Sequence, residues 1–563
     1  MAVEMLKLHP RNPTNEQRYE MVKEALNEAG RPEDFYNVIN LLSPPPDITN
    51  YAPPLSLKGI RIGIIGGGVA GLSSAFELRK LGADITIYEA LKDRIGGRIY
   101  TYYFDKAKKL YGEFGAMRVP ASHETTWHYI NLFNLKTNPF VQNNPMAFLL
   151  VRNRRTRNTS ENIEKYIYPL FPLRDWEKDT PWDELYNYGM ISSMNNLTPK
   201  ERTDILKILP KYSTPYEYLD NLSIRQVLQK TKLSQGAIEL IAGIDVLTSP
   251  LFNGSYNELM QENYPVTFNY LYQIDGGMVN LPLAFHRSLT CDEPKEYENI
   301  PHYMLGACKW KSGCVATGIY KTSNKNERVS IEYRNTSNNR NYMETFDYVI
   351  CAIPFSTLRE VDVAPVFSAR KMQAIKEFTY EDSLKTYFYC KRRFWEDDEY
   401  YGGILGGVSY TDEAIQSIVY PSDHAVRQVY CPEEPGVLLA CYSLSLDSIR
   451  VAGMKEEAKF ELTKRQVEKV HGLPAGYLDN IVKEYKSVNW NTEPYFRGAF
   501  AVNAPGQKQL FTYDILQPEY NGRIFFAGEH ASANHAWIQG ALYSGKFTAN
   551  NLAKYAMNHK KQC

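Results

Sequence analysis

A glycine-rich turn between an apolar strand and a helix is the feature that most constrains the fold. Residues 60–65 alternate into a short buried strand, and the sequence GGGVAG of residues 66–71 follows at once. Glycine is required there because the chain turns sharply and its backbone must approach a pyrophosphate closely. The helix expected over residues 69–81 directs its N-terminal amides at that phosphate. We therefore predict a dinucleotide site at Gly66, Gly68, Val69, Ala70 and Gly71.

A second strand supports this interpretation. Residues 84–89 have a strand pattern and end in Glu89. An acid about 20 residues after the glycine turn can accept hydrogen bonds from ribose hydroxyls. A glycine motif alone is weak evidence, and a surface glutamate that ends a strand is the alternative. Strand, turn, helix, strand and acid in this order predict a Rossmann-like unit.

Composition excludes several classes of protein. The chain has 563 residues, with 64 Lys+Arg and 64 Asp+Glu, so a basic nucleic-acid binder is not indicated. No stretch approaches 18 consecutive apolar residues, which argues against a membrane span. The eight cysteines show no C-x-x-C spacing, so we expect no metal site and a reducing compartment. We expect a cytoplasmic protein that acts on a small molecule, although a removed leader would be invisible.

Three further motifs carry a family resemblance. RIGGRI at 94–99, YGEFGAMRVP at 111–120 and GRIFFAGEH at 522–530 follow in order along the chain. They resemble segments of the flavin-containing amine oxidase family, in particular its L-amino-acid oxidase branch, which is related to L-amino-acid 2-monooxygenases. The resemblance extends over roughly 60–555, which is most of the chain.

The resemblance implies an α/β fold with three discontinuous parts. These are a Rossmann-like FAD-binding domain, a sheet-based substrate-binding domain and a helical insertion. The implied boundaries are 1–54 for an N-terminal strap on the substrate domain, 55–112, 275–368 and 500–563 for the FAD-binding domain, 113–155 and 369–499 for the substrate-binding domain, and 156–274 for the helical domain.

The family pattern also implies how FAD is held. Some relatives carry a cysteine bonded to the flavin where this chain has Ala499, so we expect the FAD to be noncovalent. Besides the glycine turn and Glu89, the positions that match cofactor contacts are Ala90, Gly97, Arg98, Gly115, Ala116, Met117, Arg118, Val315, Trp490, Gly528, Glu529, Trp537 and Ile538.

The substrate residues follow from the same resemblance. Arg118 offers a planar fork suited to a carboxylate, and Tyr420 matches a tyrosine that shares it. Lys385 matches a catalytic lysine that holds a water near the flavin. Phe500, Ala536 and Trp537 match residues that line the substrate cavity. A structural salt bridge for Arg118, a solvent-facing Lys385 and ordinary core rings are the alternatives.

These matches imply oxidation of an L-amino acid by O₂ to a 2-oxo acid, ammonia and hydrogen peroxide. An L-amino-acid 2-monooxygenase, a polyamine or monoamine oxidase, and a flavin-bound scaffold without turnover are the competing interpretations. The family implies a homodimer or a multiple of dimers. The preferred side chain stays open, although Glu184, Asp220 and Glu258 are acids that could pair with a basic one.

Overall fold

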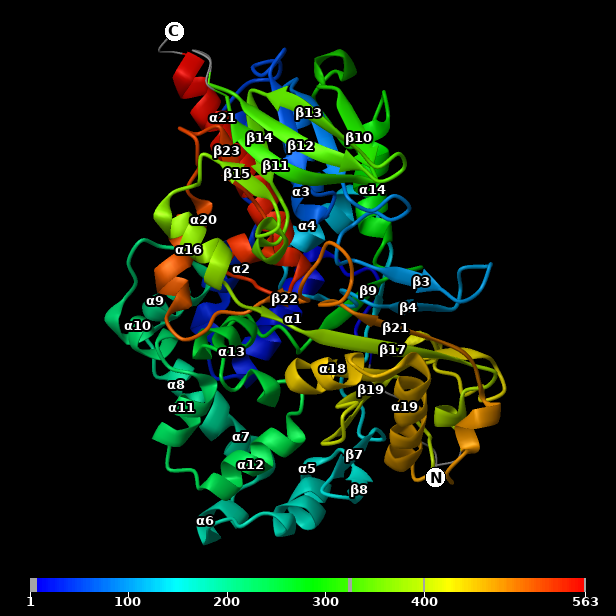
Figure 1. Ribbon diagram of the computed structural model, residues 1–563. Coiled ribbons are helices and arrows are strands. Elements are labelled where there is room, and N and C mark those ends of the chain that lie inside the picture. The colour runs from blue at the N-terminus through cyan, green and yellow to red at the C-terminus, as the bar shows by residue number, and fades with distance from the viewer. Residues whose placement is uncertain (1–7, 323–326, 398–399, 561–563) are drawn as a thin grey trace.

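The computed structural model describes residues 8–322, 327–397 and 400–560 (Figure 1). A parallel five-stranded sheet forms the upper part of the view. Its strands lie in the order β10 (Cys308–Ser312), β2 (Asp84–Glu89), β1 (Arg61–Ile65), β14 (Tyr348–Cys351) and β23 (Ile524–Phe526). The predicted α/β class with a Rossmann-like sheet is confirmed.

Both faces of this sheet are covered, as a parallel sheet requires. Helices α3 (Val69–Arg79), α14 (Asn280–Thr290) and α21 (Ile538–Lys560) pack on one face. A four-stranded sheet covers the other, in the order β13 (Arg340–Phe346), β12 (Val329–Asn335), β11 (Cys314–Lys321) and β15 (Asp362–Ala364). Gly63 marks the close approach, because a Cβ there would lie 2.6 Å from Ile331 Cδ1.

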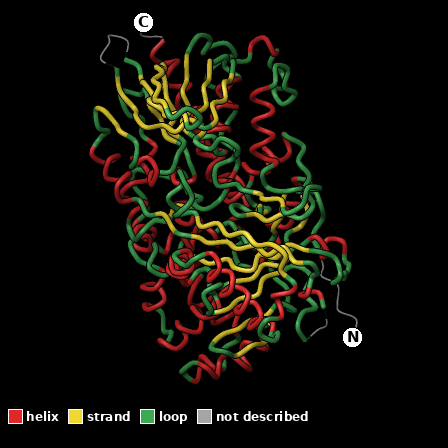
Figure 2. Tube along the Cα trace, turned by 45° about the vertical axis from the view of Figure 1, so that its right-hand side comes forward, coloured by secondary structure: helices red, strands yellow, loops and turns green. Residues whose placement is uncertain are grey.

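A second, seven-stranded sheet crosses the middle of the molecule (Figure 2). Its order is β21 (Val482–Asn489), β17 (Ser383–Cys390), β20 (Gly436–Leu444), β19 (Ser417–Tyr420), β18 (Gly407–Thr411), β7 (Phe148–Val151) and β8 (Arg154–Arg157). Helices α18 (Ser445–Ala452) and α19 (Glu456–His471) lie beside it, with Phe460 of α19 packed 5.5 Å from Phe388. The sequence predicts a single helix over 451–470, but Gly453 ends the first of two.

Short strands and helices connect the five-stranded parallel sheet with the seven-stranded sheet. The strands are β3 (Thr101–Tyr103), β4 (Tyr111–Glu113), β5 (Val119–Pro120), β6 (Thr137–Pro139), β9 (Leu271–Ile274), β16 (Tyr380–Glu381) and β22 (Phe500–Ala501). The helices are α4 (Glu124–Leu132), α15 (Phe355–Leu358), α16 (Ala369–Glu377), α17 (Asp423–Arg427) and α20 (Tyr513–Leu516).

A group of helices at the lower left of Figure 1 forms the third part. They are α5 (Ser160–Asn162), α6 (Asp175–Lys178), α7 (Trp182–Met190), α8 (Ser192–Asn195), α9 (Pro199–Arg202), α10 (Thr214–Asp220), α11 (Ile224–Lys230), α12 (Gln235–Ile244) and α13 (Tyr256–Asn263). Capping boxes at Thr198 and Ser223 fix where α9 and α11 begin. Helix α9 is short, because it gives way to a 3₁₀ turn at Thr203–Leu206.

The N-terminal segment carries α1 (Asn15–Glu28) and α2 (Phe35–Leu42) and contacts every part of the molecule. Arg18 pairs with Glu124 of α4, and Asp34 accepts a 2.7 Å hydrogen bond from Arg202 of the helical part. Lys80 of the parallel-sheet unit donates to Asp47 at 2.6 Å. The segment therefore also contacts elements outside the substrate-binding domain on which the strap was predicted to pack. The outer ends of the predicted units, 1–7 and 561–563, lie outside the described residues.

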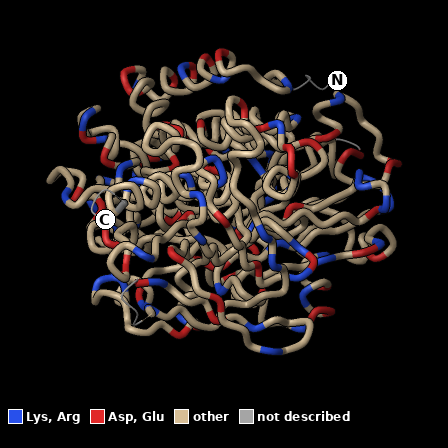
Figure 3. Tube along the Cα trace, turned by 90° about the horizontal axis from the view of Figure 1, so that it is seen from above, with Lys and Arg blue, Asp and Glu red and all other residues tan. Residues whose placement is uncertain are grey.

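No helix among the described residues is long and apolar enough to cross a membrane. Lys and Arg are interspersed with Asp and Glu over the chain (Figure 3).

Candidate active site

A cavity of about 910 Å³ extends from the glycine turn past the seven-stranded sheet to the helical part. Its walls contain most of the predicted site. The predicted residues that line it are Gly66, Gly68, Val69, Ala70, Glu89, Ala90, Gly97, Arg98, Gly115, Ala116, Met117, Arg118, Val315, Lys385, Trp490, Phe500, Gly528, Glu529, Ala536, Trp537 and Ile538. Gly71 and Tyr420 do not line it.

The glycine turn forms a cradle at one end of the cavity. Gly66 has φ +107°, a conformation that favours glycine, and a Cβ on Gly71 would lie 2.1 Å from Gly66 O. A Cβ on Gly68 would meet only Gly97 Cα, at 3.9 Å, and would otherwise enter open space. Helix α3 begins one residue later. The turn is therefore tightly packed at Gly71 and leaves open space at Gly68. A bound pyrophosphate requires such an open side.

Glu89 ends β2 beside this cradle. Its two carboxylate oxygens accept hydrogen bonds from the backbone N–H of Gly67 at 2.9 Å and of Leu91 at 2.8 Å. Burial raises the pKa of Glu89, and these two hydrogen bonds oppose that effect. A carboxylate fixed in this way at the wall of the cavity can accept ribose hydroxyls.

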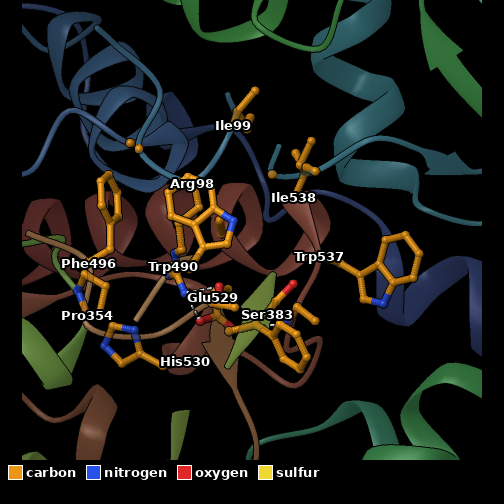
Figure 4. A pocket seen from close by; sticks show the side chains of 18 of the residues that line it. Arg98, Ile99, Pro354, Ser383, Trp490, Phe496, Glu529, His530, Trp537 and Ile538 are labelled. Atoms are coloured by element: carbon orange, nitrogen blue, oxygen red, sulfur yellow. Dashed lines mark hydrogen bonds and ion pairs between the residues drawn. The ribbon is translucent and has the colours of Figure 1, made fainter. Parts of the chain in front are cut away.

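Glu529 is the second fixed carboxylate (Figure 4). It pairs with Arg98 at 2.9 Å and accepts the N–H of Ala501 and Ala536, each at 3.0 Å. Burial disfavours its ionisation, but Arg98 beside it holds the pKa of Glu529 below its usual value. Arg98 also donates to Ala499 O at 2.9 Å. The turn after β23 is thereby bound to the segment that contains Ala499.

Aromatic side chains form the walls farther along. Trp490 donates its indole N–H to Phe114 O at 2.9 Å, and a Cβ on Gly115 would approach Trp490 Cζ2 to 3.3 Å. In the view of Figure 4, Trp490 and Phe496 lie to one side of Glu529 and Trp537 to the other. A glycine cradle, two placed carboxylates and flat aromatic walls fit the diphosphate, ribose and ring system of FAD.

Lys385 projects from β17 into the same cavity. Its ammonium donates to Glu113 O at 3.1 Å and to Gly115 O at 2.7 Å, and it lies 4.8 Å from the ring centre of Tyr442. Burial, reinforced by the charge of Arg118, lowers the pKa of Lys385 to about 7. The solvent-facing alternative is excluded, because the side chain is only 4 % exposed.

Arg118 lies across the cavity with its guanidinium among rings. It donates to Gln142 Oε1, and Gln142 donates in turn to Tyr410 Oη at 2.9 Å. Its Cζ is 5.1 Å from the ring centre of Phe268 and 5.9 Å from that of Trp537. Among the described residues it has no ion-pair partner, so the structural salt-bridge alternative finds no support. A guanidinium of this kind can pair with an anion that enters the cavity.

The role predicted for Tyr420 is wrong. Its side chain is fully buried, and its hydroxyl hydrogen-bonds Ser409 at 2.8 Å and His471 at 2.9 Å beneath α19. It faces the apolar side of the sheet and cannot reach a ligand beside Arg118. Tyr410 and Tyr442 line the cavity instead. Tyr442 is paired with Lys385 across β17 and β20, a register that the sequence alone does not give.

The acids suggested for side-chain recognition also lie elsewhere. Glu184 is exposed, Asp220 bonds Ser255 and Gln509, and Glu258 pairs with His535 at 3.3 Å. None of these three lines the cavity. The acids of the helical part that do are Asp183, Asp245 and Glu262. Nowhere in the described ranges do three His, Cys, Asp or Glu side chains form a group that could hold a metal ion.

The chain is similar to known proteins over most of its length. The family model for flavin containing amine oxidoreductase matches residues 69–553. An L-amino-acid oxidase of Bungarus fasciatus is 27% identical over 491 residues, which cover 87% of this chain and 86% of the relative. One of Crotalus adamanteus is 28% identical over 507 residues, 88% of each chain.

Solved structures show the same fold. Putrescine oxidase bound to putrescine has a TM-score of 0.65 at 18% identity, covering 87% of this chain and 98% of its own. Cyclohexylamine oxidase from Brevibacterium oxydans has a TM-score of 0.63 at 14% identity, with coverage of 88% and 99%. Because the family model matches nearly the whole length, the chain belongs to the flavin-containing amine oxidoreductase family.

Proposed function

We propose that the protein oxidises an L-amino acid to a 2-oxo acid, with release of ammonia and hydrogen peroxide. Its family makes it an oxidoreductase with FAD as cofactor. The observation that carries the proposal is Arg118, whose guanidinium makes no ion pair with any carboxylate of the described residues and lies in a cavity that also contains Lys385. An α-amino acid brings the carboxylate that such a cation pairs with, whereas a simple amine does not.

Arg118 would orient the substrate. A bidentate ion pair fixes the carboxylate, and the hydrogen bonds from Arg118 to Gln142 and from Gln142 to Tyr410 hold the guanidinium in place. Catalysis would then come largely from holding the Cα–H bond in one direction within the cavity. Trp537 and Phe268 form the flat walls beside it.

The remaining residues of the site would prepare and protect the reaction. The glycine turn, Glu89 and Glu529 would hold FAD, which would supply the acceptor for the hydride from Cα and the route for its electrons to O₂. The amine must be neutral to lose that hydride, and the positive charges of Arg118 and Lys385 favour the neutral form. Water then hydrolyses the imino acid to the 2-oxo acid and ammonia.

Two other reactions would use the same cavity. A monooxygenase would convert the amino acid to carbon dioxide and an amide one carbon shorter. A polyamine or monoamine oxidase would need no anion receptor, and the unpaired Arg118 speaks against it. The curated relatives named L-amino-acid oxidase favour the oxidase over both.

A product analysis over the twenty L-amino acids tests the proposal. We expect peroxide and ammonia in equal amounts, a 2-oxo acid by mass spectrometry and no turnover of the D-enantiomers. A dominant amide would replace the oxidase with the monooxygenase. Oxidation of amines alone, with no amino acid consumed, would reject the proposal.

A further inference from the structure

The cavity has an uneven distribution of charge. Arg118 and Lys385 lie on the part built by the segment around β5 and by β17. The lining residues contributed by 156–274 include Asp183, Asp245 and Glu262, and among the described residues of that stretch no Lys or Arg lines the cavity. The cavity therefore has a cationic part and an acidic part.

Glu262 is the acid nearest the cationic part. Burial raises the pKa of Glu262 to about 7, and Arg118 and the indole of Trp537 oppose that effect. No ion pair joins its carboxylate to a cation within the described ranges. The indole nitrogen of Trp537, which approaches it, is buried without a hydrogen-bond partner of normal geometry. Both polar groups at this point of the wall are left incompletely satisfied by the protein.

Asp245 lies at the end of α12, deeper in the helical part. Tyr186 donates its hydroxyl to Asp245 at 2.8 Å, and the N–H of Thr248 lies at 3.3 Å. Burial raises the pKa of Asp245, and these hydrogen bonds oppose the shift. Asp245 also acts electrostatically on Glu262. It too has no ion pair with a described Lys or Arg. Neither carboxyl group on this wall therefore makes an ion pair within the described part of the chain, and the cation that acts electrostatically on Glu262 is Arg118.

Asp245 and Glu262 are half-buried in the wall of the cavity. Withdrawing a carboxylate from water without a cation is costly, and a ligand that supplies the cation reduces that cost. The lining residues of the helical part also include Trp182 and Tyr186, whose rings can attract an ammonium or guanidinium group. Neutral side chains would leave both carboxyl groups unpaired, and acidic side chains would be repelled. The cavity thus complements a molecule with a carboxylate at one end and an additional cation at the other.

We infer that the preferred substrate is an L-amino acid with a positively charged side chain, whose distal cation is bound by Asp245 and Glu262. This inference rests on the proposed oxidation of L-amino acids at the same site. It assigns substrate specificity to two residues for which the family resemblance gave no role.

Steady-state oxygen consumption by the FAD-loaded enzyme tests the inference. The probes are L-lysine, L-ornithine and L-arginine, with L-norleucine and L-glutamine as neutral analogues of similar length. We expect kcat/KM for the best basic substrate to exceed that for L-norleucine by about 100-fold or more.

Asp245→Asn and Glu262→Gln should each lower kcat/KM for the basic substrate by about 30-fold or more. The same variants should change kcat/KM for L-norleucine by less than about threefold, because a neutral chain does not use the carboxylates. Glu184→Gln, at an exposed acid outside the cavity, is the matched control and should change neither value.

Equal or better use of L-norleucine by the parent enzyme would overturn the inference, and this comparison does not depend on any variant folding. A loss that is the same for basic and neutral substrates would also overturn it. Oxidation of neutral L-amino acids alone would leave the proposed function standing while removing the inference. Oxidation of putrescine with no amino acid consumed would instead remove the proposed function.

Discussion

Arg118 and Tyr420 show how far single residues can be assigned from sequence. Both were matched to the family pattern, but only the guanidinium lies in the cavity. The match for Arg118 rests on a long segment, whereas Tyr420 stands in a short β-strand where a shift of one residue reverses the face. The tyrosines that line the cavity, Tyr410 and Tyr442, depend on strand pairing across distant parts of the chain.

Arg118→Ala should lower kcat/KM for L-amino acids while FAD content stays at the parent level. The loss of a charge-assisted contact to a buried carboxylate costs about 2–5 kcal/mol, or roughly 30-fold to several thousand-fold. Tyr420→Phe is the control, since its hydroxyl bonds only Ser409 and His471, and it should change kcat/KM little. Normal turnover by Arg118→Ala would remove the residue from substrate binding.

Ala499 should leave the flavin untethered. No cysteine stands at this position, where some relatives bond the flavin covalently. Acid or heat precipitation should therefore release intact FAD into the supernatant, measurable by its absorbance and by mass spectrometry. Yellow colour retained in the washed, denatured pellet would contradict the expectation.

Lys385 should make stability depend on pH in a defined direction. Burial lowers the pKa of Lys385 from 10.5 to about 7. Below pH 7 Lys385 is therefore charged in both the folded and the unfolded state, and the folded state bears the full free-energy cost of burying that charge. Above pH 7 the unfolded chain binds one proton more, and the penalty shrinks by about 1.4 kcal/mol per pH unit up to pH 10.5. Lys385→Met removes this dependence.

Calorimetry of both FAD-loaded proteins from pH 6 to pH 9 measures the effect. The melting temperature of Lys385→Met relative to the parent should be highest at pH 6–7 and should decline toward pH 9. A difference that does not change with pH would show that Lys385 does not titrate in this range.

At the scale of elements, local chemistry was sufficient for the first strand, turn and helix. The GGGVAG turn requires glycine at particular backbone positions, and the sequence therefore placed β1, α3 and β2 well. Elements that depend on tertiary contacts were predicted less well. β13 carries mostly exposed polar residues and was missed, because nothing in its own sequence shows that it pairs with β12.

The helical part shows the same limit at the site itself. Asp245 and Glu262 line the cavity because α12 and α13 pack with those positions inward, whereas Asp220 and Glu258 point into other contacts. All four acids lie in a helix of this part or at its end. Only the packing of the helices decides which of them meets a ligand.

Gly71→Ala should disrupt the dinucleotide turn. Alanine favours helices by about 1 kcal/mol over glycine, but here its Cβ would lie 2.1 Å from the backbone oxygen of Gly66, which cannot rotate away. We expect FAD content to fall well below half and the melting temperature to drop. Gly453→Ala is the control, because its Cβ would have no atom closer than 3.5 Å. Full FAD content in Gly71→Ala would show that the backbone of the turn can shift to accommodate the added methyl group.

At the scale of the whole molecule, the N-terminal segment joins parts that are distant in sequence. Asp34 is fully buried and lies 2.7 Å from Arg202 Nε and 3.4 Å from Arg31 Nη1. Arg31 in turn donates to Tyr264 O at 3.1 Å. One carboxylate therefore bridges two buried guanidinium groups where the segment meets the helical part.

Asp34→Ala should destabilise the protein strongly, because it leaves two buried cations without their shared partner. Breaking a buried ion pair from one side costs about 3–5 kcal/mol. Glu33→Gln, at a half-exposed partner of the same Arg202, should cost less than about 1 kcal/mol. Thermal melts of both variants measure the difference. Equal melting temperatures would mean that the segment is only loosely bound.

The order of strands in the parallel sheet has a consequence for how the protein is made. β1 and α3 leave the ribosome early, but β23 and α21 are encoded at the far end of the chain. Ser74 of α3 donates to Gly545 O of α21 at 2.8 Å, and a Cβ on Gly545 would lie 2.1 Å from Ser73 Oγ, so the two helices are in direct contact. The nascent chain therefore carries the surface of α3 that packs on α21 uncovered until residues 538–560 have been synthesised. An mRNA truncated before codon 524 would encode a polypeptide that lacks β23 and α21. We expect such a polypeptide to be bound by chaperones or degraded and not to fold into a smaller flavoprotein.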